Sequence, residues 1–417
     1  MKKRVQESNL RRAMIWNTTG NIIYSFCQWL ITILVVRLAS YEQAGYLSLA
    51  MTTSSTYSTI ALFRMRDFQV SDVKKEYNSG DYTGSRVVTC QLGMLACLAA
   101  AAMAGAGWYQ ALCIDLFMLV RIAEASHDVL AGVDQMHDRY DFIGISLCLR
   151  GGITVIVFSI VITLTGNMAV AILGMAAGNL LVVFLYDVRM TSRLENIKPK
   201  FSKKIWKLLA TCIPLVLFSF MNTLVNLVPK QDLQDITSTK ILGVYSSIAS
   251  PTLVVQVFAS YIFAPILPKI SEILAEKKYN EFQSHLHKIY AILAIFIGVI
   301  YLVGRIFGRL GLLILYGRDI LEYTNWLYPV VLCTALLATV WILSSIVVAL
   351  RRIKAMVVCM ILSMGFLFPM SRYLIKMYGP NGASYVQIFT YLFLSAGLVI
   401  IIEASLHKLK NRQIKND

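Results

Sequence analysis

The sequence predicts an all-α integral membrane protein with about twelve transmembrane helices, arranged as two six-helix bundles around a central cavity. Hydrophobic residues make up 57% of the 417 residues, and the mean hydropathy is +0.64. Only 15% of the residues are charged, whereas soluble domains average about 25%. The apolar residues also form long blocks, each close to the ~20 residues that a bilayer-spanning helix requires. Lipid is therefore the expected solvent.

Twelve apolar blocks are long enough to span a bilayer. The first follows a basic N-terminus, but its apolar run extends to about Ser40 without a small-residue cleavage site. We therefore interpret it as a retained helix and not as a secretory signal. The expected spans are 16–38, 44–63, 87–107, 109–130, 142–164, 168–188, 207–228, 242–266, 288–308, 326–350, 355–377 and 382–404.

The distribution of basic residues predicts the orientation. Of the 39 Lys and Arg residues, 29 lie in the two termini and the even-numbered connectors, seven lie on the opposite side, and three lie within spans. Cytoplasmic connectors carry the excess of Lys and Arg in membrane proteins. Both termini are therefore expected in the cytoplasm. The same distribution explains the net charge of +16 without a nucleic-acid partner.

The largest basic connector follows the sixth span and divides the chain into equal sets of helices. We expect an N-terminal six-helix bundle at 1–190, a basic cytoplasmic linker at 191–207 and a C-terminal six-helix bundle at 208–417. Such a layout is typical of transporters with internal repeats, whose binding site lies where the repeats meet.

Polar side chains recur at helical spacing in the first, second and seventh spans. Amides and hydroxyls facing lipid would lack hydrogen-bond partners. These side chains therefore either bond neighbouring helices to one another or line a hydrated cleft. Their recurrence in both halves of the chain favours the cleft. The candidate cavity residues are Asn17, Asn21, Gln28, Ser48, Thr52, Asn222, Asn226 and Lys230.

The cleft is expected to be electropositive. The first and seventh spans contain no Asp or Glu, and Lys230 continues the Asn stripe of the seventh span. Amides edged by cations suit sugars and phosphates, because Lys and Arg bind phosphate through charge-assisted hydrogen bonds. Lys230 is the best single candidate for substrate contact. Arg37 and Arg372 are candidate anion contacts, although snorkelling to the outer headgroups is the default interpretation of both.

Four charged residues lie at similar depth in the fourth and fifth spans. Arg121, Glu124 and Asp128 share one helix face, and Arg150 lies near the start of the next span. A charge inside a bilayer is costly without a partner, so we expect the four to pair. They form either a structural ion-pair cluster or a cytoplasmic gate or ion-coupling relay.

Catalytic and metal-binding motifs are absent from the sequence. It contains no HExxH, no Walker A motif and no Gly-rich phosphate loop. The eight cysteines occur singly in apolar stretches, and the five histidines show no convincing ligand spacing. We expect no metal, no cofactor and no enzymatic activity.

Several stretches resemble the Wzx-type polysaccharide flippases, in matching order along the chain. They are residues 16–25 (WNTTGNIIYS), 44–50 (AGYLSLA), 66–72 (RDFQVSD), 132–135 (GVDQ), 139–141 (RYD), 149–151 (LRG), 249–251 (ASP) and 263–269 (FAPILPK). The family often has Pro-Arg after the seventh span, where this chain has Pro229-Lys230. Lysine keeps the charge but loses bidentate geometry.

The resemblance implies the multidrug/oligosaccharidyl-lipid/polysaccharide exporter fold and a place in the bacterial cytoplasmic membrane. It also implies a flippase that moves a polyprenyl-diphosphate-linked oligosaccharide by alternating access for cell-surface polysaccharide biosynthesis. Membrane lipids, a polysaccharide polymerase and glycosyltransferases are the expected partners. The alternatives are a multidrug exporter of the same fold, which the missing carboxylates disfavour, and a non-catalytic component of a glycan-assembly complex. A membrane glycosyltransferase is disfavoured because the outer connectors are short and poor in acid.

Overall fold

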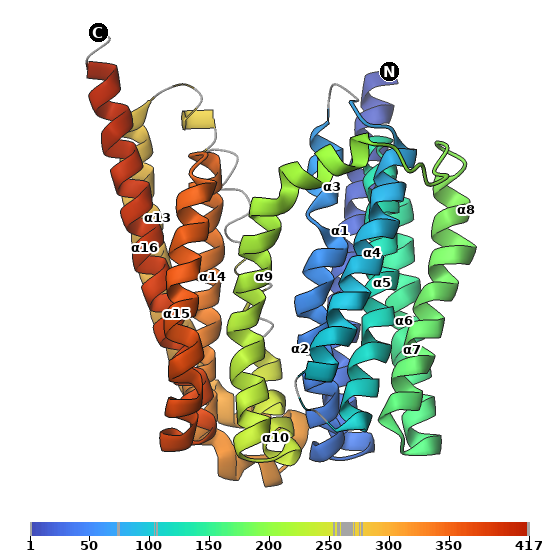
Figure 1. The fold of residues 1–417 in the computed structure, drawn as a ribbon, viewed down its shortest axis with the longest axis vertical. Coiled ribbons are helices and arrows are strands. Elements are labelled where there is room, and N and C mark those ends of the chain that lie inside the picture. Colours follow the sequence, from blue (N-terminus) through green and yellow to red (C-terminus); the bar gives the residue numbers. More distant parts are fainter. Residues whose placement is uncertain are drawn as a thin grey trace. The chain divides into compact units, whose positions relative to one another are not determined.

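The computed structural model describes residues 2–414 except 73–75, 104, 106, 253–254, 257–258, 260–269, 271, 275 and 277. In the described part of the chain every regular element is helical (Figure 1), which confirms the all-α fold class. The chain forms two compact units, Met1–Thr223 (unit 1) and Leu224–Asp417 (unit 2). The boundary falls inside one long helix, whereas the expected bundles divide at the connector before it.

Unit 1 contains six long helical segments and one short helix, together with the first part of a seventh long helix. In chain order the helices are α1 Lys2–Leu38, α2 Tyr41–Leu62, α3 Met65–Ser71, α4 Ser79–Met103, α5 Trp108–Met136, α6 Tyr140–Thr165, α7 Met168–Val182, α8 Val188–Thr191 and the start of α9 Lys204–Ile236. A π-helical turn, Val183–Asp187, joins α7 to α8 without a break.

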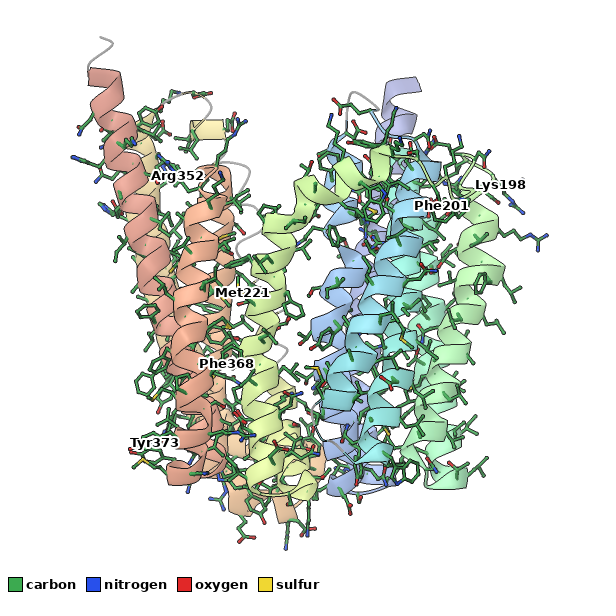
Figure 2. All side chains as sticks on the ribbon, viewed as in Figure 1. Lys198, Phe201, Met221, Arg352, Phe368 and Tyr373 are labelled. Atoms are coloured by element: carbon green, nitrogen blue, oxygen red, sulfur yellow. The ribbon has the colours of Figure 1, made fainter. Side chains whose placement is uncertain are left out.

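Unit 2 contains the rest of α9 and the helices that follow it. They are α10 Thr239–Ala249, a 3-10 turn Ser250–Thr252, α13 Tyr279–Tyr316, a 3-10 segment Asp319–Trp326, α14 Leu327–Ala349, α15 Ile353–Tyr378 and α16 Pro380–Ile414. Large apolar side chains stand on the surface of these helices, as Phe368 and Tyr373 do on α15 (Figure 2). This surface is what a lipid-facing helix requires.

Nine helical segments in the described ranges are long and apolar enough to cross a membrane. The chain is therefore a multi-pass membrane protein. Helices α2 and α5 occupy two further expected spans but are more polar, since α2 is rich in Ser and Thr and α5 carries several charges. The expected eighth span, 242–266, begins in α10, and most of its second half lies outside the described residues. The 263–269 stretch lies wholly outside them.

Polar caps mark the starts of two long helices, and residues with positive φ mark two helix ends. The Ser40 hydroxyl accepts a hydrogen bond from the Gln43 amide at the start of α2, and Asn167 caps α7 in the same way. Gly166 ends α6 with a positive φ, the usual device for stopping a helix. Phe63 and Arg64 also have positive φ, which turns the chain abruptly from α2 into α3.

Helices α1 and α6 approach closely at a pair of glycines. A Cβ atom placed on Gly144 of α6 would lie 2.2 Å from the carbonyl oxygen of Trp16, and one on Gly20 would lie 2.5 Å from that of Gly144. Small residues allow such backbone contact between membrane helices. The glycine face of α1 is thereby committed to α6.

The interior of unit 1 is filled by apolar side chains from α1, α2, α4, α5, α6 and α7. Phe117, Met118, Phe158 and Met175 are almost wholly buried in one cluster. A tight core of this kind holds α5 and α6 in fixed register, so the polar side chains that they carry are also fixed.

The connector between α8 and α9 is attached to α4. The Lys200 amide donates to the Gly80 carbonyl at 2.8 Å, and the Ser202 hydroxyl donates to Asp81 at 2.9 Å. The backbone at Lys200 lies so close to Gly84 that a Cβ there would meet the Lys200 oxygen at 2.1 Å. The expected linker, 191–207, therefore lies against unit 1.

Candidate functional site

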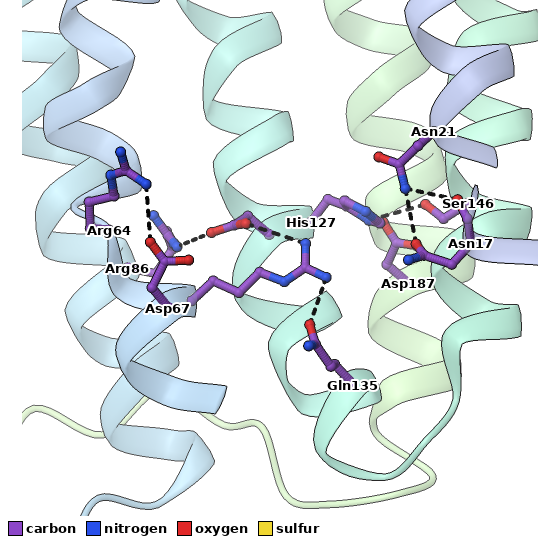
Figure 3. A network of polar contacts seen from close by, with 11 residues as sticks. Asn17, Asn21, Arg64, Asp67, Arg86, His127, Gln135, Ser146 and Asp187 are labelled. Atoms are coloured by element: carbon purple, nitrogen blue, oxygen red, sulfur yellow. Dashed lines mark hydrogen bonds and ion pairs between the residues drawn. The ribbon is translucent and has the colours of Figure 1, made fainter. Parts of the chain in front are cut away.

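The polar stripe of α1 is open at its centre. Asn21 is exposed, and its Nδ2 donates to the Asn17 carbonyl at 2.8 Å and to Asn17 Oδ1 at 3.0 Å (Figure 3). Gln28, two turns further along, is half-buried, and its Nε2 has no hydrogen-bond partner among the described residues. Helix α1 packs on α6 through Gly20, while the side chain of Asn21 is exposed.

The hydroxyls of α2 are mostly occupied within their own helix. Ser48 is buried, and Thr52 donates to the Ser48 carbonyl at 2.7 Å. Thr56 likewise donates to the Thr52 carbonyl at 3.0 Å. Such bonds satisfy a hydroxyl in an apolar setting without a second helix.

The stripe of α9 crosses the boundary between the units. In unit 1, Asn222 is half-buried, and its Oδ1 has no hydrogen-bond partner in the part of the chain that the structure describes. In unit 2, Asn226 Nδ2 donates to the Tyr391 hydroxyl at 3.3 Å, and Lys230 is half-buried one turn later.

The two candidate anion contacts have different surroundings. Arg37 is exposed near the end of α1. Arg372 of α15 pairs with two carboxylates of α9, since its Nε lies 2.8 Å from Asp232 Oδ1 and its Nη2 lies 3.3 Å from Asp235 Oδ2. Ser371 donates to the other oxygen of Asp232 at 2.6 Å. Arg372 thus links α15 to the last turns of α9.

The charged set expected in the fourth and fifth spans divides into two groups. In the first, Arg121 Nη1 lies 2.6 Å from Glu124 Oε2, and the Tyr24 hydroxyl of α1 donates to Glu124 Oε1. Arg150 lies over the Tyr24 ring, with its Cζ 5.2 Å from the ring centre. Its Nε donates to Asn179 Oδ1 of α7 at 3.1 Å. Arg150 therefore joins this group through Tyr24 rather than through a carboxylate.

Asp128 belongs to the second group, which we name the α2–α5 arginine cluster: Arg64, Arg66, Asp67, Arg86, Asp128 and Gln135. Asp128 Oδ2 lies 2.7 Å from Arg86 Nη2, and Asp128 Oδ1 lies 3.7 Å from Arg66 Nη1. In Figure 3 the dashed contacts run from Arg86 through Asp128 and Arg66 to Gln135, and Arg64 pairs separately with Asp67. It contains three arginines and two aspartates.

The cluster joins two of the stretches that carry the family resemblance. Arg66 Nη2 donates to Gln135 Oε1 at 3.0 Å. Next to it, Gln69 is fully buried, and a Cβ on Gly132 would lie 2.2 Å from the Gln69 amide oxygen. Stretches 66–72 and 132–135 therefore form one contact, in which the missing side chain of Gly132 makes room for Gln69.

Unit 1 contains a buried His–Asp pair that was not predicted from the sequence. His127 Nδ1 lies 3.0 Å from Asp187 Oδ2 and 3.2 Å from the Ser146 hydroxyl, and all three side chains are buried (Figure 3). Asp187 ends the π-helical turn after α7. The sequence did contain a signal for this pair. Asp187 is a carboxylate at the end of an otherwise apolar span, and such residues are rare and need a partner.

Asp134, in the last turn of α5 beyond the expected span, is buried near this pair. Burial raises the pKa of Asp134 to about 7, and the nearby Asp187 adds to the rise, whereas Arg139 opposes it. In the unfolded chain an Asp ionises near pH ~3.9. The contribution of the Asp134 carboxyl to the stability of the folded state is therefore complete below that pH. It is lost as the pH rises through the folded pKa.

Replacing Asp134 by asparagine is expected to raise the thermal unfolding midpoint at pH 8, because the amide stays neutral while the wild-type carboxyl must ionise. The difference from the wild type should shrink as the pH is lowered to 5. Thermal unfolding of the detergent-purified variants measures both values. Asp138→Asn is the matched control, since Asp138 is exposed in the next turn. A pH-independent gain for Asp134→Asn would contradict the assigned pKa.

Comparison with known proteins places the fold. No family model matches the chain. The capsular polysaccharide biosynthesis protein CapF of Staphylococcus aureus is 23% identical over 304 residues, which cover 72% of this chain and 76% of CapF.

Solved structures match nearly the whole chain at 12% identity. An inward-facing multidrug-resistance MATE transporter of the MOP superfamily has a TM-score of 0.70 and covers 96% of this chain and 99% of its own. The lipid II flippase MurJ, in an inward closed conformation, has a TM-score of 0.69 with coverages of 97% and 93%. A mutant form of the MATE transporter VcmN of Vibrio cholerae has a TM-score of 0.64 with coverages of 96% and 97%.

These matches confirm the expected fold, that of the multidrug/oligosaccharidyl-lipid/polysaccharide exporters, with helices in two lobes. They also support the resemblance to polysaccharide flippases. The solved neighbours are named as transporters and as a flippase.

Proposed function

We propose that the chain flips a polyprenyl-diphosphate-linked oligosaccharide across the bacterial cytoplasmic membrane, by alternating access, for cell-surface polysaccharide biosynthesis. The observation that carries the proposal is the similarity to CapF along 72% of the chain, joined to a fold shared with a lipid II flippase. CapF is named for capsular polysaccharide biosynthesis, and MurJ is named as a lipid II flippase. The polar residues of the chain can then be assigned to the sugar and diphosphate parts of the substrate.

A sugar chain cannot enter ~30 Å of hydrocarbon without losing its hydrogen bonds to water. A flippase must replace those bonds with its own donors and acceptors. Asn21 is exposed on α1, and Gln28 and Asn222 carry amide atoms without partners. These amides are suited to sugar hydroxyls, because each amide can donate and accept.

The negatively charged diphosphate needs a succession of cationic side chains to contact as it crosses the membrane. Arg64 and Arg66 are the more exposed arginines of the α2–α5 arginine cluster, since their side chains are 57% and 30% exposed, whereas the Arg86 side chain is 3% exposed. They lie where α2 ends, on the side predicted to be cytoplasmic. We assign them the first contact with the diphosphate, and we assign Lys230 of α9 a later contact nearer the outer side.

Replacing Lys230 by alanine should reduce surface polysaccharide about tenfold or more while leaving the membrane abundance of the protein unchanged. A charge-assisted hydrogen bond contributes ~1.5–3 kcal/mol, which corresponds to at least a tenfold loss. Surface hexose and lipid-linked saccharide would be quantified in cells whose own gene is replaced by the variant. The lipid-linked precursor should accumulate as the surface product falls.

Lys240→Ala is the matched control, because Lys240 is an exposed lysine at the start of α10. Lys230→Arg should retain most export, since it keeps the charge. Normal export by Lys230→Ala would remove Lys230 from the substrate path. The loss of export by the control as well would indicate an effect on folding.

A multidrug exporter of the same fold is the second candidate, favoured by the match to MATE transporters. A drug-resistance assay separates the two functions. If expression of the protein raised resistance to cationic drugs, and deletion of its gene left the surface polysaccharide unchanged, the exporter function would be supported.

A further inference from the structure

Arg150 is the largest fully buried side chain among the described residues, with 1% of its surface exposed. It lies on α6 and is held from α7 by Asn179, whose Oδ1 accepts from its Nε. Asn179 is itself fixed, because its Nδ2 donates to Thr154 at 2.8 Å and to the Met175 carbonyl at 2.9 Å. The guanidinium is therefore positioned by a rigid polar frame.

One end of this guanidinium lacks an acceptor. Arg150 Nη2 is buried, and no described residue offers it a hydrogen-bond acceptor. Of the two carboxylates expected to pair with it, Glu124 pairs with Arg121, and Asp128 pairs with Arg66 and Arg86. No ion pair among the described residues includes Arg150. Burial of a charged donor without an acceptor is strongly unfavourable.

The local charge is also unbalanced. Arg150 lies over the Tyr24 ring, and the carboxylate in this group is Glu124, whose oxygens accept from Arg121 and Tyr24. Arg121 adds a second buried N–H without a partner, its Nε. Two guanidiniums and one carboxylate leave one positive charge. A water molecule could accept a hydrogen bond here but would not neutralise that charge.

We propose that unit 1 binds a small monovalent anion, of the size of chloride, beside Arg150 where α1, α5, α6 and α7 meet. Arg150 Nη2 donates to the anion, and Asn179 positions the guanidinium for this contact. The anion balances the Arg121–Glu124–Arg150 group. Arg121 and Glu124 are 17% and 19% exposed, so this group is only partly enclosed. The proposal does not depend on the transported substrate.

The test titrates sodium chloride against sodium gluconate at constant ionic strength, with the purified full-length protein in detergent. The thermal unfolding midpoint should rise with chloride and then saturate, by about 2–4 °C, because a ligand that binds the folded state stabilises it. Bromide should act as chloride does. Chloride-35 nuclear magnetic resonance should show line broadening by the wild type, and this signal requires no variant to fold.

Arg150→Met keeps much of the side-chain volume and removes the donors, so it should abolish both the saturable rise and the line broadening. Arg86→Met is the matched control, because Arg86 is equally buried in unit 1 but is paired with Asp128. Arg305→Met, which removes an exposed arginine on α13, is the control if Arg86→Met does not fold. Both controls should keep the chloride effect.

Three results would overturn the proposal. The first is a wild-type midpoint that does not respond to chloride together with no line broadening, which would assign the acceptor to water. The second is a chloride effect that persists in Arg150→Met. The third is loss of the effect in Arg305→Met, which would show that it follows overall charge.

Discussion

Replacing Asp128 by asparagine is expected to destabilise unit 1 by about 3–5 kcal/mol, the loss measured when one partner of a buried ion pair is removed. Asp128 lies 2.7 Å from Arg86, whose side chain is 3% exposed. The variant would leave the Arg86 charge buried with backbone and amide contacts alone. The drop in thermal unfolding midpoint and in membrane abundance measures this effect.

The double variant Arg86→Met with Asp128→Leu should recover much of that stability, because it removes both charges from the interior. Asp67→Asn is the matched single control. Asp67 pairs with Arg64 at 3.2 Å, but both side chains are more than half exposed, so its loss should change stability by less than about 1 kcal/mol. Equal effects of the Asp67 and Asp128 variants would argue against a buried pair at Asp128.

Replacing Gly144 by alanine is expected to destabilise unit 1 by about 1–3 kcal/mol or more, as overpacking does elsewhere. The added Cβ would lie 2.2 Å from the Trp16 carbonyl oxygen and 2.5 Å from the carbonyl carbon. These are backbone atoms of α1, so α1 as a whole must move away from α6. Thermal unfolding and the yield of folded protein measure the loss.

Gly152 of the same helix offers a matched control, because a Cβ there meets nothing within 4 Å. Gly152→Ala should be neutral or slightly stabilising, since alanine favours the helix by about 1 kcal/mol relative to glycine. A displaced α1 would also move the Asn17–Asn21 stripe. Gly144→Ala should therefore reduce export even when the protein is supplied at normal abundance, whereas Gly152→Ala should not.

The polar stripes were predictable from the sequence because spacing on a helix determines which side chains share a face. Asn17 and Asn21 do contact one another, and Asn21 is exposed. The partners across helices were not predictable. Nothing in the spacing of Asn226 indicates Tyr391, which lies 165 positions away and accepts its hydrogen bond.

The charged residues give the clearest difference between expectation and structure. Arg121, Glu124 and Asp128 share a face of α5, and that spacing predicted one cluster. The structure supplies Arg86 from α4 and Tyr24 from α1, and these two divide the face between two groups. The contacts depend on which helices pack on α5, and a pattern along α5 alone carries no information about them.

The sequence by itself determined the solvent, the helical class and the polar faces, since hydrophobicity and helical periodicity are local properties of a chain. The tertiary structure alone decided how charge is compensated. It placed Arg150 on Asn179 without a carboxylate, Asp128 on Arg86, and His127 on Asp187. Compensation requires atoms within ~3–4 Å of one another, and only the packing of helices, set here by contacts such as Gly20 on Gly144, brings distant positions to that range.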